Sequence, residues 1–316
     1  MIKVSVIIPV YGVEKYIERC ARSLFEQSLD NIEFIFIDDC TPDHSIEILK
    51  SIIKEYRLRI AEKNYKVRIE RMPTNSGLPA VRRHGIQLAT GEYIIHCDSD
   101  DWVDCDIYRV LYNNAVENKA DITYCDYYLS DGVNNTYLSQ AGLHGLLQGP
   151  LWNRLVKASL YHNNILFPTA NKAEDSALMM QLSFYSSNNH YVEEPLYYYF
   201  YNPNSICRVQ DKDSILRNYQ EEVQNTNIVI SFLKSHHAEN VYKADIIKRK
   251  SFARDCLLPI INEEGIYKLW LNTYKEINYQ FIFCNGLTIR NKLGFIKKIL
   301  TPIVSFFKSI TTTRTS

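Results

Sequence analysis

Short apolar runs alternate with amphipathic stretches over the first 130 residues of the chain. Runs rich in β-branched and aromatic residues predict strands over residues 4–11, 32–39, 65–72, 92–97 and 120–129. Apolar positions three and four residues apart predict helices over residues 13–28, 45–58, 79–90 and 104–118. Because strands and helices follow each other at spacings of roughly 25 to 30 residues, the pattern predicts an α/β fold with a doubly wound, mostly parallel sheet.

The alternation ends after the fifth predicted strand. A polar loop precedes an amphipathic stretch, NKAEDSALMMQL at 171–182, and a tyrosine-rich strand pattern at 191–205. From about Val209 onwards the apolar spacing is helical. We therefore expect two parts, an α/β domain over residues 1–207 and a helical C-terminal region over residues 208–316.

Charge is balanced overall but not along the chain. The 316 residues carry 36 bases and 36 acids, so no excess of positive charge points to nucleic acid as a partner. From Ile277 to Ser316 there is no acid, while the bases in this stretch are Arg290, Lys292, Lys297, Lys298, Lys308 and Arg314. A basic tail on an acidic body indicates an anionic surface as a neighbour.

The tail over residues 287–310 also carries apolar residues at helical spacing before Pro302. Two interpretations stay open: a basic amphipathic segment on an anionic membrane, or a helix that packs its apolar face on the protein. No apolar span reaches about 18 residues, and the N-terminal run contains Pro9, so we expect neither a transmembrane helix nor a signal peptide. Eight scattered cysteines without a CxxC pair favour a reducing compartment. We expect a cytoplasmic protein, peripheral on the inner face of the membrane if the tail binds lipid.

Acidic residues gather where the fourth predicted strand ends. Asp98, Asp100 and Asp101 follow it directly, and three neighbouring carboxylates repel one another unless a cation lies among them. Ligands of doubly wound sheets bind beyond the carboxyl ends of the strands. Mg²⁺ and Mn²⁺ take oxygen ligands there and keep positions open for phosphate oxygens. The alternative is a solvated acidic turn in which Asp101 or Asp104 caps the next helix.

Two other strand ends carry candidate binding residues. Asp38 and Asp39 follow the second strand, where they could accept hydrogen bonds from a ribose or a base. The alternative is a turn in which Asp43 caps the next helix. Tyr11 follows the first strand, where its ring could stack on a base, although an edge aromatic is the simpler explanation.

A further acidic pair, Glu174 and Asp175, begins the helical pattern at 171–182. A carboxylate there could take a proton from an attacking hydroxyl. The alternative is structural, because the helix dipole alone favours acids in the first turn by ~0.3–1 kcal/mol.

Taken together, these stretches resemble one family. The order and spacing typical of the family 2 glycosyltransferases of the GT-A fold are found in VSVIIPVYGVEKYIERCARSLFEQS, EFIFIDDCTPD, NSGLPAVRRHGIQLATGEYIIHCDSDD and AEDSALMMQL. The resemblance covers residues 1–205 and is specific as a set. It implies a nucleotide-sugar donor, with UDP as the default nucleotide and GDP or dTDP as alternatives, and a divalent Mn²⁺ or Mg²⁺ ion. It also implies an inverting transfer to a hydroxyl of a glycan or lipid-linked acceptor, as in surface polysaccharide synthesis.

The resemblance assigns the donor side to residues at three strand ends. The nucleotide pocket would be lined by Pro9, Val10, Tyr11 and Glu14. Asp39 would read the base, with Asp38 beside it. Asp98 and Asp100 match the DxD motif, so Asp100 would be the principal metal ligand, and Asp98 would ligate the metal or face the ribose or sugar. Asp101, at the fourth position of the motif, could assist either role.

The acceptor side comes from later residues. Asp175 matches the acid usually identified as the catalytic base, with Glu174 as its neighbour. Trp152, Asn153 and Arg154 fall in a segment similar to the W-N-K-L stretch of the family and would shape the acceptor side.

The chain departs from the family pattern at two places. Cys40 replaces the glycine of DDGS, which affects the local turn but not the aspartates. Where A-R-N is common, Arg82 keeps the basic position and would face a phosphate or the sugar, while Arg83 replaces an amide. A surface arginine on a helix is the simpler explanation of Arg83.

Three other classes of protein are less consistent with the sequence. A dinucleotide oxidoreductase would need G-x-G-x-x-G after the first strand, and the motif is absent. A nucleotidyltransferase of related fold would carry a glycine-rich basic loop where this chain has PVYGVEKY. The remaining alternative is a non-catalytic protein of the same fold that binds a nucleotide-sugar or serves as a scaffold. The presence of the DxD motif and of the Glu–Asp pair argues against it.

Overall fold

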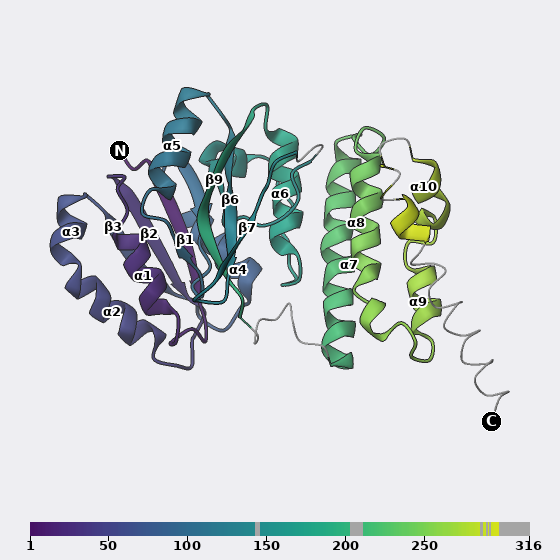
Figure 1. The fold of residues 1–316 in the computed structure, drawn as a ribbon, viewed down its shortest axis with the longest axis horizontal. Helices are drawn as coiled ribbons and strands as arrows, with labels where there is room; N and C mark the ends of the chain where they lie inside the picture. The colour runs from purple at the N-terminus through teal and green to yellow at the C-terminus, as the bar shows by residue number, and fades with distance from the viewer. Residues whose placement is uncertain (143–145, 203–210, 285–286, 289, 291, 297–316) are drawn as a thin grey trace. The chain divides into compact units, whose positions relative to one another are not determined.

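The computed structural model describes residues 1–142, 146–202, 211–284, 287–288, 290 and 292–296. It divides into two compact units, Met1–Asn204 and Ser205–Ser316 (Figure 1). The first unit is an α/β structure, and the described part of the second is helical. The boundary expected between residues 207 and 208 lies outside the described residues.

The first unit contains one sheet, with nine strands among the described residues. Its main path runs β3 (Lys66–Arg71), β2 (Ile32–Asp38), β1 (Val4–Val10), β4 (Tyr93–His96), β8 (Arg154–Lys157), β6 (Ile122–Ser130), β9 (Asn189–Phe200) and β5 (Trp102–Val103), and β7 (Asn135–Leu138) pairs with β6. β1 is parallel to β2 and β4, and β2 is parallel to β3. The predicted mostly parallel α/β sheet is therefore confirmed.

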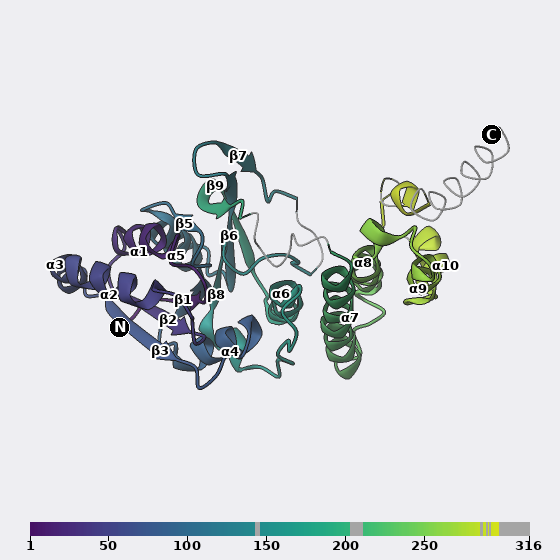
Figure 2. The same ribbon diagram turned by 90° about the horizontal axis from the view of Figure 1, so that it is seen from below.

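Helices cover both faces of the sheet (Figure 2). One face packs against α1 (Ile17–Phe25), α2 (Ser45–Glu55) and α5 (Ile107–Glu117), and the other against α4 (Leu78–Leu88) and α6 (Glu174–Tyr185). Side chains alternate across a strand, so Val6 and Ile8 of β1 join the first core and Ile7 joins the second. Burial on both faces explains why β1 and β2 are continuous apolar runs.

Three short strands were not expected from the sequence. One of them, β7, pairs antiparallel with β6 in a stretch predicted to be a loop. β8 runs antiparallel between β4 and β6, so the last strand of the predicted series is not a neighbour of β4. β5 pairs with β9 just before the predicted helix at 104–118, which begins only at Ile107. Strands of four and two residues are too short to show a hydrophobic period.

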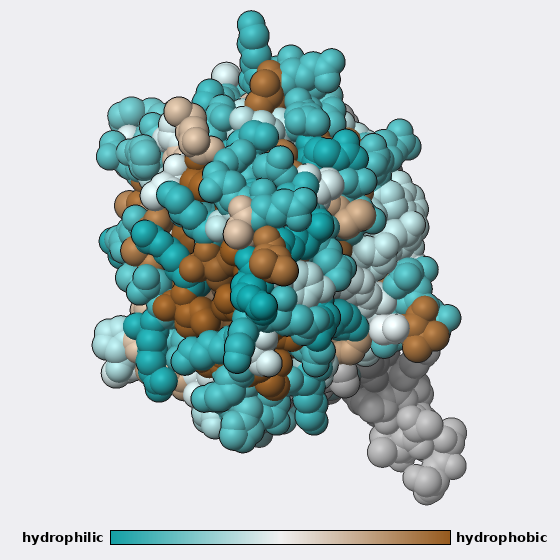
Figure 3. Space-filling model, turned by 90° about the vertical axis from the view of Figure 1, so that its left-hand side faces the viewer, coloured by the Kyte–Doolittle hydropathy of each residue, from teal (hydrophilic) through white to brown (hydrophobic). Residues whose placement is uncertain are grey.

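β3 is an edge strand of the sheet, and α3 (Arg57–Glu62) precedes it. The exposed positions of β3 are the charged residues Lys66, Arg68 and Arg71. Figure 3 shows this side of the first unit as mostly hydrophilic, with a smaller hydrophobic patch near its centre. Charged side chains on an edge strand discourage pairing with another chain.

The second unit contains α7 (Lys212–Ser235), α8 (Lys243–Asp255), α9 (Ile266–Asn272) and α10 (Ile277–Phe283). α7 packs against α8, and α8 against α10. A buried ion pair joins Arg249 of α8 to Glu222 of α7 at 3.3 Å. None of the described helices combines the length and the apolar character needed to cross a bilayer. Most of the basic tail lies in 297–316, outside the described residues.

Candidate active site

The carboxyl ends of β1, β2 and β4 meet at one edge of the sheet. Pro9 and Val10 end β1, and Val10 pairs with Asp38 at the end of β2. Tyr11 follows with its side chain 51% exposed. Asp38 is buried, and its carboxylate accepts a hydrogen bond from the main chain of Thr41 (2.8 Å). The residues assigned to the nucleotide side therefore lie where ligands bind in this fold class.

Asp43 fastens the loop after β1 to the loop after β2. Its carboxylate accepts hydrogen bonds from the main chain of Glu14 (2.9 Å) and from the hydroxyls of Thr41 (2.7 Å) and Ser45 (2.6 Å). Burial alone raises the pKa of Asp43, but these bonds outweigh it and lower the pKa to about 2. The carboxylate of Glu14 accepts a bond from the main chain of His44 (3.2 Å). The sequence suggested only a helix cap for Asp43, because its bond to Glu14 spans 29 positions.

Asp39 fastens the start of α4 to the end of β2. Its two carboxylate oxygens accept hydrogen bonds from the main-chain N–H groups of Ser76 (2.7 Å) and Gly77 (2.9 Å). Each oxygen keeps a second lone pair, so the bonds are compatible with the predicted contact to a base. Cys40 follows at φ 58°, in the left-handed region that favours glycine. The turn is therefore kept with a cysteine where a glycine is typical.

The acidic turn, residues 98–101, is held against β9. Asp101 is fully buried, and its carboxylate accepts hydrogen bonds from the hydroxyl of Tyr197 (2.6 Å) and from the main chain of β9 (2.7 Å). Asn202 donates to the carboxylate of Asp100 (3.1 Å). Burial and the repulsion among neighbouring carboxylates raise the pKa values of Asp100 and Asp101. The turn therefore concentrates negative charge that a bound cation would stabilise.

Arg82 of α4 links the acidic turn to the start of α6. Its buried guanidinium donates to Asp98 (2.7 Å) and to Glu174. Burial lowers the pKa of Arg82, but the carboxylates of Glu174, Asp98 and Asp175 outweigh burial and raise it. The sequence suggested that Arg82 faces a phosphate or the sugar, and that contact stays a prediction. The observed bridge carries no sequence signal, because its partners lie 16 and 92 positions away. Arg83, the next residue, is exposed.

Glu174 and Asp175 begin α6 but differ in accessibility. Glu174 is buried against Arg82, and burial raises its pKa to about 8 although Arg82 acts in the opposite direction. Asp175 is half-buried, and its carboxylate accepts a hydrogen bond from the main chain of Ser176 (2.7 Å). A general base must reach the proton that it takes. The geometry therefore favours Asp175 over Glu174 for the predicted role of base.

The three residues assigned to the acceptor side are all buried. Trp152 stacks on Tyr197 of β9, with ring centroids 4.3 Å apart. Asn153 donates to the main chain of β6 (2.6 Å). Arg154 donates to the main-chain carbonyl of Gln148 (3.2 Å). Arg154 therefore holds the loop that precedes β8, while Trp152 and Asn153 contact β9 and β6. A direct contact with an acceptor stays a prediction.

The acidic turn fits a hard divalent cation. Carboxylate oxygens are ligands that Mg²⁺ and Mn²⁺ prefer. Arg82 binds one oxygen of Asp98, which leaves the other oxygen for a cation, and the side chain of Asp98 is 27% exposed. Asp100 is also partly exposed. Asp101 gives both of its oxygens to β9, so Asp98 and Asp100 are the better candidate ligands.

Another group of possible ligands lies just beyond the acidic turn. Within the described residues, ligand atoms within 4.8 Å of one another are found in Asp104, Cys105 and Asp106. Asp104 accepts a hydrogen bond from the main chain of Asp106 (2.9 Å), and Asp106 pairs with Arg109 (3.0 Å). These contacts stabilise the start of α5, which gives this partly exposed group a structural role without a metal.

The sequence matches the model of the protein family described as Glycosyl transferase family 2 over residues 5–184. The chain belongs to the family 2 glycosyltransferases. A relative named uncharacterized glycosyltransferase EpsJ, from Bacillus subtilis (strain 168), is 31% identical over 244 residues, which are 70% of this chain and 67% of EpsJ. A poly(ribitol-phosphate) beta-glucosyltransferase from Bacillus spizizenii is 33% identical over 195 residues, which are 56% of this chain and 29% of that protein.

Solved structures with the same fold include two that were determined with bound ligands. S. aureus TarS 1-349 in complex with UDP superimposes with a TM-score of 0.56 at 18% identity, covering 92% of this chain and 93% of that one. The mannosyltransferase PcManGT from Pyrobaculum calidifontis, in complex with GDP-Man and Mn²⁺, gives a TM-score of 0.52 at 14% identity, covering 95% and 87%. At such identities the likeness concerns the fold, and it confirms the GT-A class expected for this family 2 glycosyltransferase.

Proposed function

We propose that this family 2 glycosyltransferase is metal-dependent and inverting, and that it moves a sugar from a nucleotide-sugar donor, with UDP the favoured nucleotide, to a hydroxyl of a glycan or lipid-linked acceptor. One observation carries the proposal. Arg82 binds Asp98 of the acidic turn and Glu174 at the start of α6, so it brings the candidate metal ligands next to the candidate base. A role in surface polysaccharide synthesis is supported by the poly(ribitol-phosphate) glucosyltransferase among the relatives.

The donor would bind across the carboxyl ends of β1, β2 and β4. In this arrangement Tyr11 stacks on the base, Asp39 accepts a hydrogen bond from it, and Asp98 and Asp100 hold the divalent ion. TarS with UDP, and PcManGT with GDP-Man and Mn²⁺, support a nucleotide-sugar donor and a metal ion. When bound, such an ion acts as a Lewis acid that stabilises the negative charge of the departing nucleoside diphosphate.

Asp175 would act as the general base. It takes the proton of the acceptor hydroxyl while the hydroxyl oxygen forms a bond to the anomeric carbon, and the bond from that carbon to the phosphate oxygen breaks. The displacement occurs on the opposite face of the sugar, so one step inverts the anomeric centre without a covalent intermediate. Glu174 stays paired with Arg82 and keeps the base in place.

A panel of nucleotide-sugars tests the proposal. We expect the full chain, incubated with Mn²⁺, to hydrolyse or transfer from one donor and to release its nucleoside diphosphate, because Arg82 links the candidate metal ligands to the start of the helix that carries the candidate base. The released diphosphate would be measured by a coupled assay. A non-catalytic member of the fold would instead show a thermal shift with a nucleotide-sugar but release no diphosphate with any donor.

The C-terminal region supports contact with an anionic membrane on the cytoplasmic side. α10 buries Ile277 and Phe281 on one face and exposes Tyr279 (74%) and Phe283 (77%) on the other. The segment that starts with α10 contains bases but no acid. Exposed aromatic residues in a segment that also carries bases are typical of regions that bind the surface of an anionic bilayer, and here the bases follow α10 from Arg290 onwards.

Vesicle co-sedimentation tests this contact. The full chain should bind vesicles that contain an anionic lipid and should bind purely zwitterionic vesicles weakly. Phe283→Ser should reduce the bound fraction, because it removes an exposed aromatic from α10. Phe252→Ser is the matched control, since Phe252 of α8 is also exposed (58%) but precedes the acid-free segment. If both variants bind like the wild type, α10 does not contact the membrane.

A further inference from the structure

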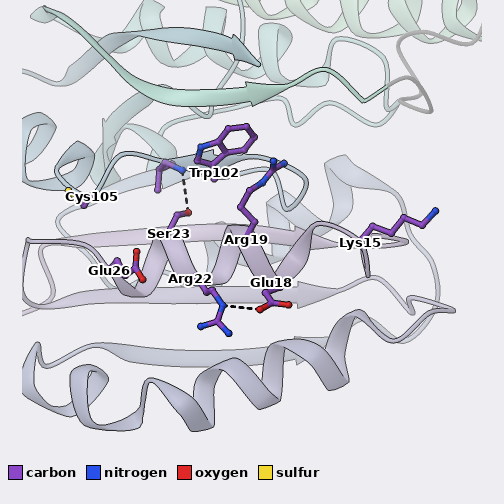
Figure 4. Close-up of a pocket in the computed structure, with 9 residues that line it drawn as sticks. Lys15, Glu18, Arg19, Arg22, Ser23, Glu26, Trp102 and Cys105 are labelled. Carbon is purple, nitrogen blue, oxygen red and sulfur yellow. Dashed lines mark hydrogen bonds and ion pairs between the residues drawn. The ribbon is translucent and has the colours of Figure 1, made fainter. Parts of the chain in front are cut away.

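Arg19 of α1 contacts the main chain of the acidic turn, although no motif singles it out. Its guanidinium carbon lies 3.6 Å from the ring centroid of Trp102 and 4.7 Å from that of Phe200. Its Nη2 donates to the main-chain carbonyl of Asp100 (3.1 Å). Figure 4 shows the Arg19 side chain extending from α1 to the indole of Trp102. Arg19 therefore joins α1 to the main chain at the candidate metal ligand.

Asp98 and Asp101 of the acidic turn are held by other hydrogen bonds. Arg82 binds Asp98, and Asp101 is bound by β9. Among the described residues, Asn202 donates the side-chain hydrogen bond that the carboxylate of Asp100 accepts. The main chain of Asp100 is held by Arg19 instead. The direction of the Asp100 carboxylate thus depends on a residue outside the motif.

Arginine suits this position for physical reasons. Its planar guanidinium can stack on an aromatic ring and donate in its own plane at the same time. Trp102 is itself stacked on Tyr198 of β9, with centroids 5.2 Å apart, so the platform under Arg19 is part of the sheet. Asp101 and Asp100 are also among the groups that act on Arg19 electrostatically. The cation therefore offsets part of the negative charge of the acidic turn without occupying a carboxylate oxygen of Asp100.

A cavity borders Arg19 on the outer side of α1. It has a volume of about 600 Å³ and is lined by Lys15, Glu18, Arg19, Arg22, Ser23, Glu26, Trp102, Val103 and Cys105 (Figure 4). Shortening Arg19 would therefore enlarge an open cavity and would not leave a sealed void in the core. Variants at this position are expected to fold.

We propose that Arg19 is a positioning residue of the metal–diphosphate site, which fixes the main chain at Asp100 and so presets the Asp100 carboxylate for the metal. The inference rests on the proposed function and adds a residue to it. Residues that orient metal ligands typically change metal affinity by about 10–100-fold when they are replaced. Arg19 is expected to act at the lower end of this range, because its bond goes to the main chain.

The test compares Arg19→Gln and Arg19→Lys with Arg22→Gln. Arg22 lies one turn along α1 and lines the same cavity, but it binds Glu18 and Glu55. UDP binding is measured by calorimetry at increasing Mn²⁺. Arg19→Gln should raise the Mn²⁺ concentration for half-maximal UDP binding about 10-fold. Saturating Mn²⁺ should restore both binding and turnover. Arg19→Lys should need a Mn²⁺ concentration between those of Arg19→Gln and the wild type. Arg22→Gln should need the same concentration as the wild type.

Two outcomes would overturn the inference. In one, Arg19→Gln and Arg22→Gln need the same Mn²⁺ concentration for half-maximal UDP binding. In the other, Arg19→Gln loses UDP binding that added Mn²⁺ does not restore, which would mark Arg19 as a packing residue only. If Arg19→Gln does not fold, the Mn²⁺ requirement of Arg19→Lys is compared with that of Arg22→Gln instead. A wild type that binds UDP with Mn²⁺ keeps the proposed function intact in either case, whereas a wild type that does not bind removes the proposed function itself.

Discussion

Asp175→Asn should lower turnover by about 10²–10⁴-fold, the contribution typical of a general base, and leave UDP binding close to that of the wild type. Asparagine keeps the size of the side chain but cannot accept the proton of the acceptor hydroxyl. Asp175 is half-buried at the start of α6, so the exchange removes little packing. Single-turnover rates with the donor identified by the panel, together with calorimetry of UDP, separate the two effects.

Glu174→Gln gives the contrast for this prediction. Above the raised pKa of Glu174, about 8, the Glu174 carboxylate is charged. Glu174→Gln then leaves Arg82 without one of two buried partners, and breaking a buried ion pair costs about 3–5 kcal/mol in the free energy of unfolding. We therefore expect Glu174→Gln to lower the melting temperature above about pH 8 and to change it less at lower pH, where Glu174 is protonated, whereas Asp175→Asn should have a near-normal melting temperature. Turnover of Asp175→Asn at the wild-type rate would show that another group takes the proton.

Asp100→Ala should abolish the dependence of turnover on Mn²⁺, together with most of the turnover itself. Asp100 is partly exposed, and burial together with the nearby Asp98 raises its pKa, so it lies where a cation is favoured. Removing it leaves Asp98 as the remaining candidate ligand, with one oxygen already bound to Arg82. The measurement is the initial rate as a function of Mn²⁺ concentration.

Asp104→Ala is the control for that experiment. Asp104 belongs to the neighbouring group of possible ligands, but its carboxylate serves the start of α5. Its Mn²⁺ dependence should match that of the wild type. The reverse result, with Asp104→Ala losing the metal response and Asp100→Ala keeping it, would move the metal site out of the acidic turn.

Much of the first unit could be predicted from the sequence, because buried parallel strands are long apolar runs. β1 and β2 were found within one residue of their ends, and each is buried along most of its length. β5, β7 and β8 were missed because they are too short to show a period, although β8 separates β4 from β6. Topology of this kind depends on pairings between distant segments, which local patterns do not specify.

The sequence predicted where the candidate site lies in the fold better than it predicted the hydrogen bonds that hold its residues. The acids at the strand ends marked the edge of the sheet, and the structure brings them to one edge as expected. The bonds that hold them carry no such signal: Arg82 reaches Glu174 across 92 positions, and Arg19 reaches the main chain of Asp100 across 81. The roles of the site residues stay predictions that the variants above address.

UDP binding to the wild type, measured by calorimetry with Mn²⁺ and again with EDTA in its place, tests the central claim most directly. The account predicts saturable binding with Mn²⁺ and a loss of most of the affinity with EDTA, because the negatively charged diphosphate would then face Asp98 and Asp100 without a cation between them. Equal affinity in the two titrations would contradict the claim that the acidic turn holds the donor through a divalent ion.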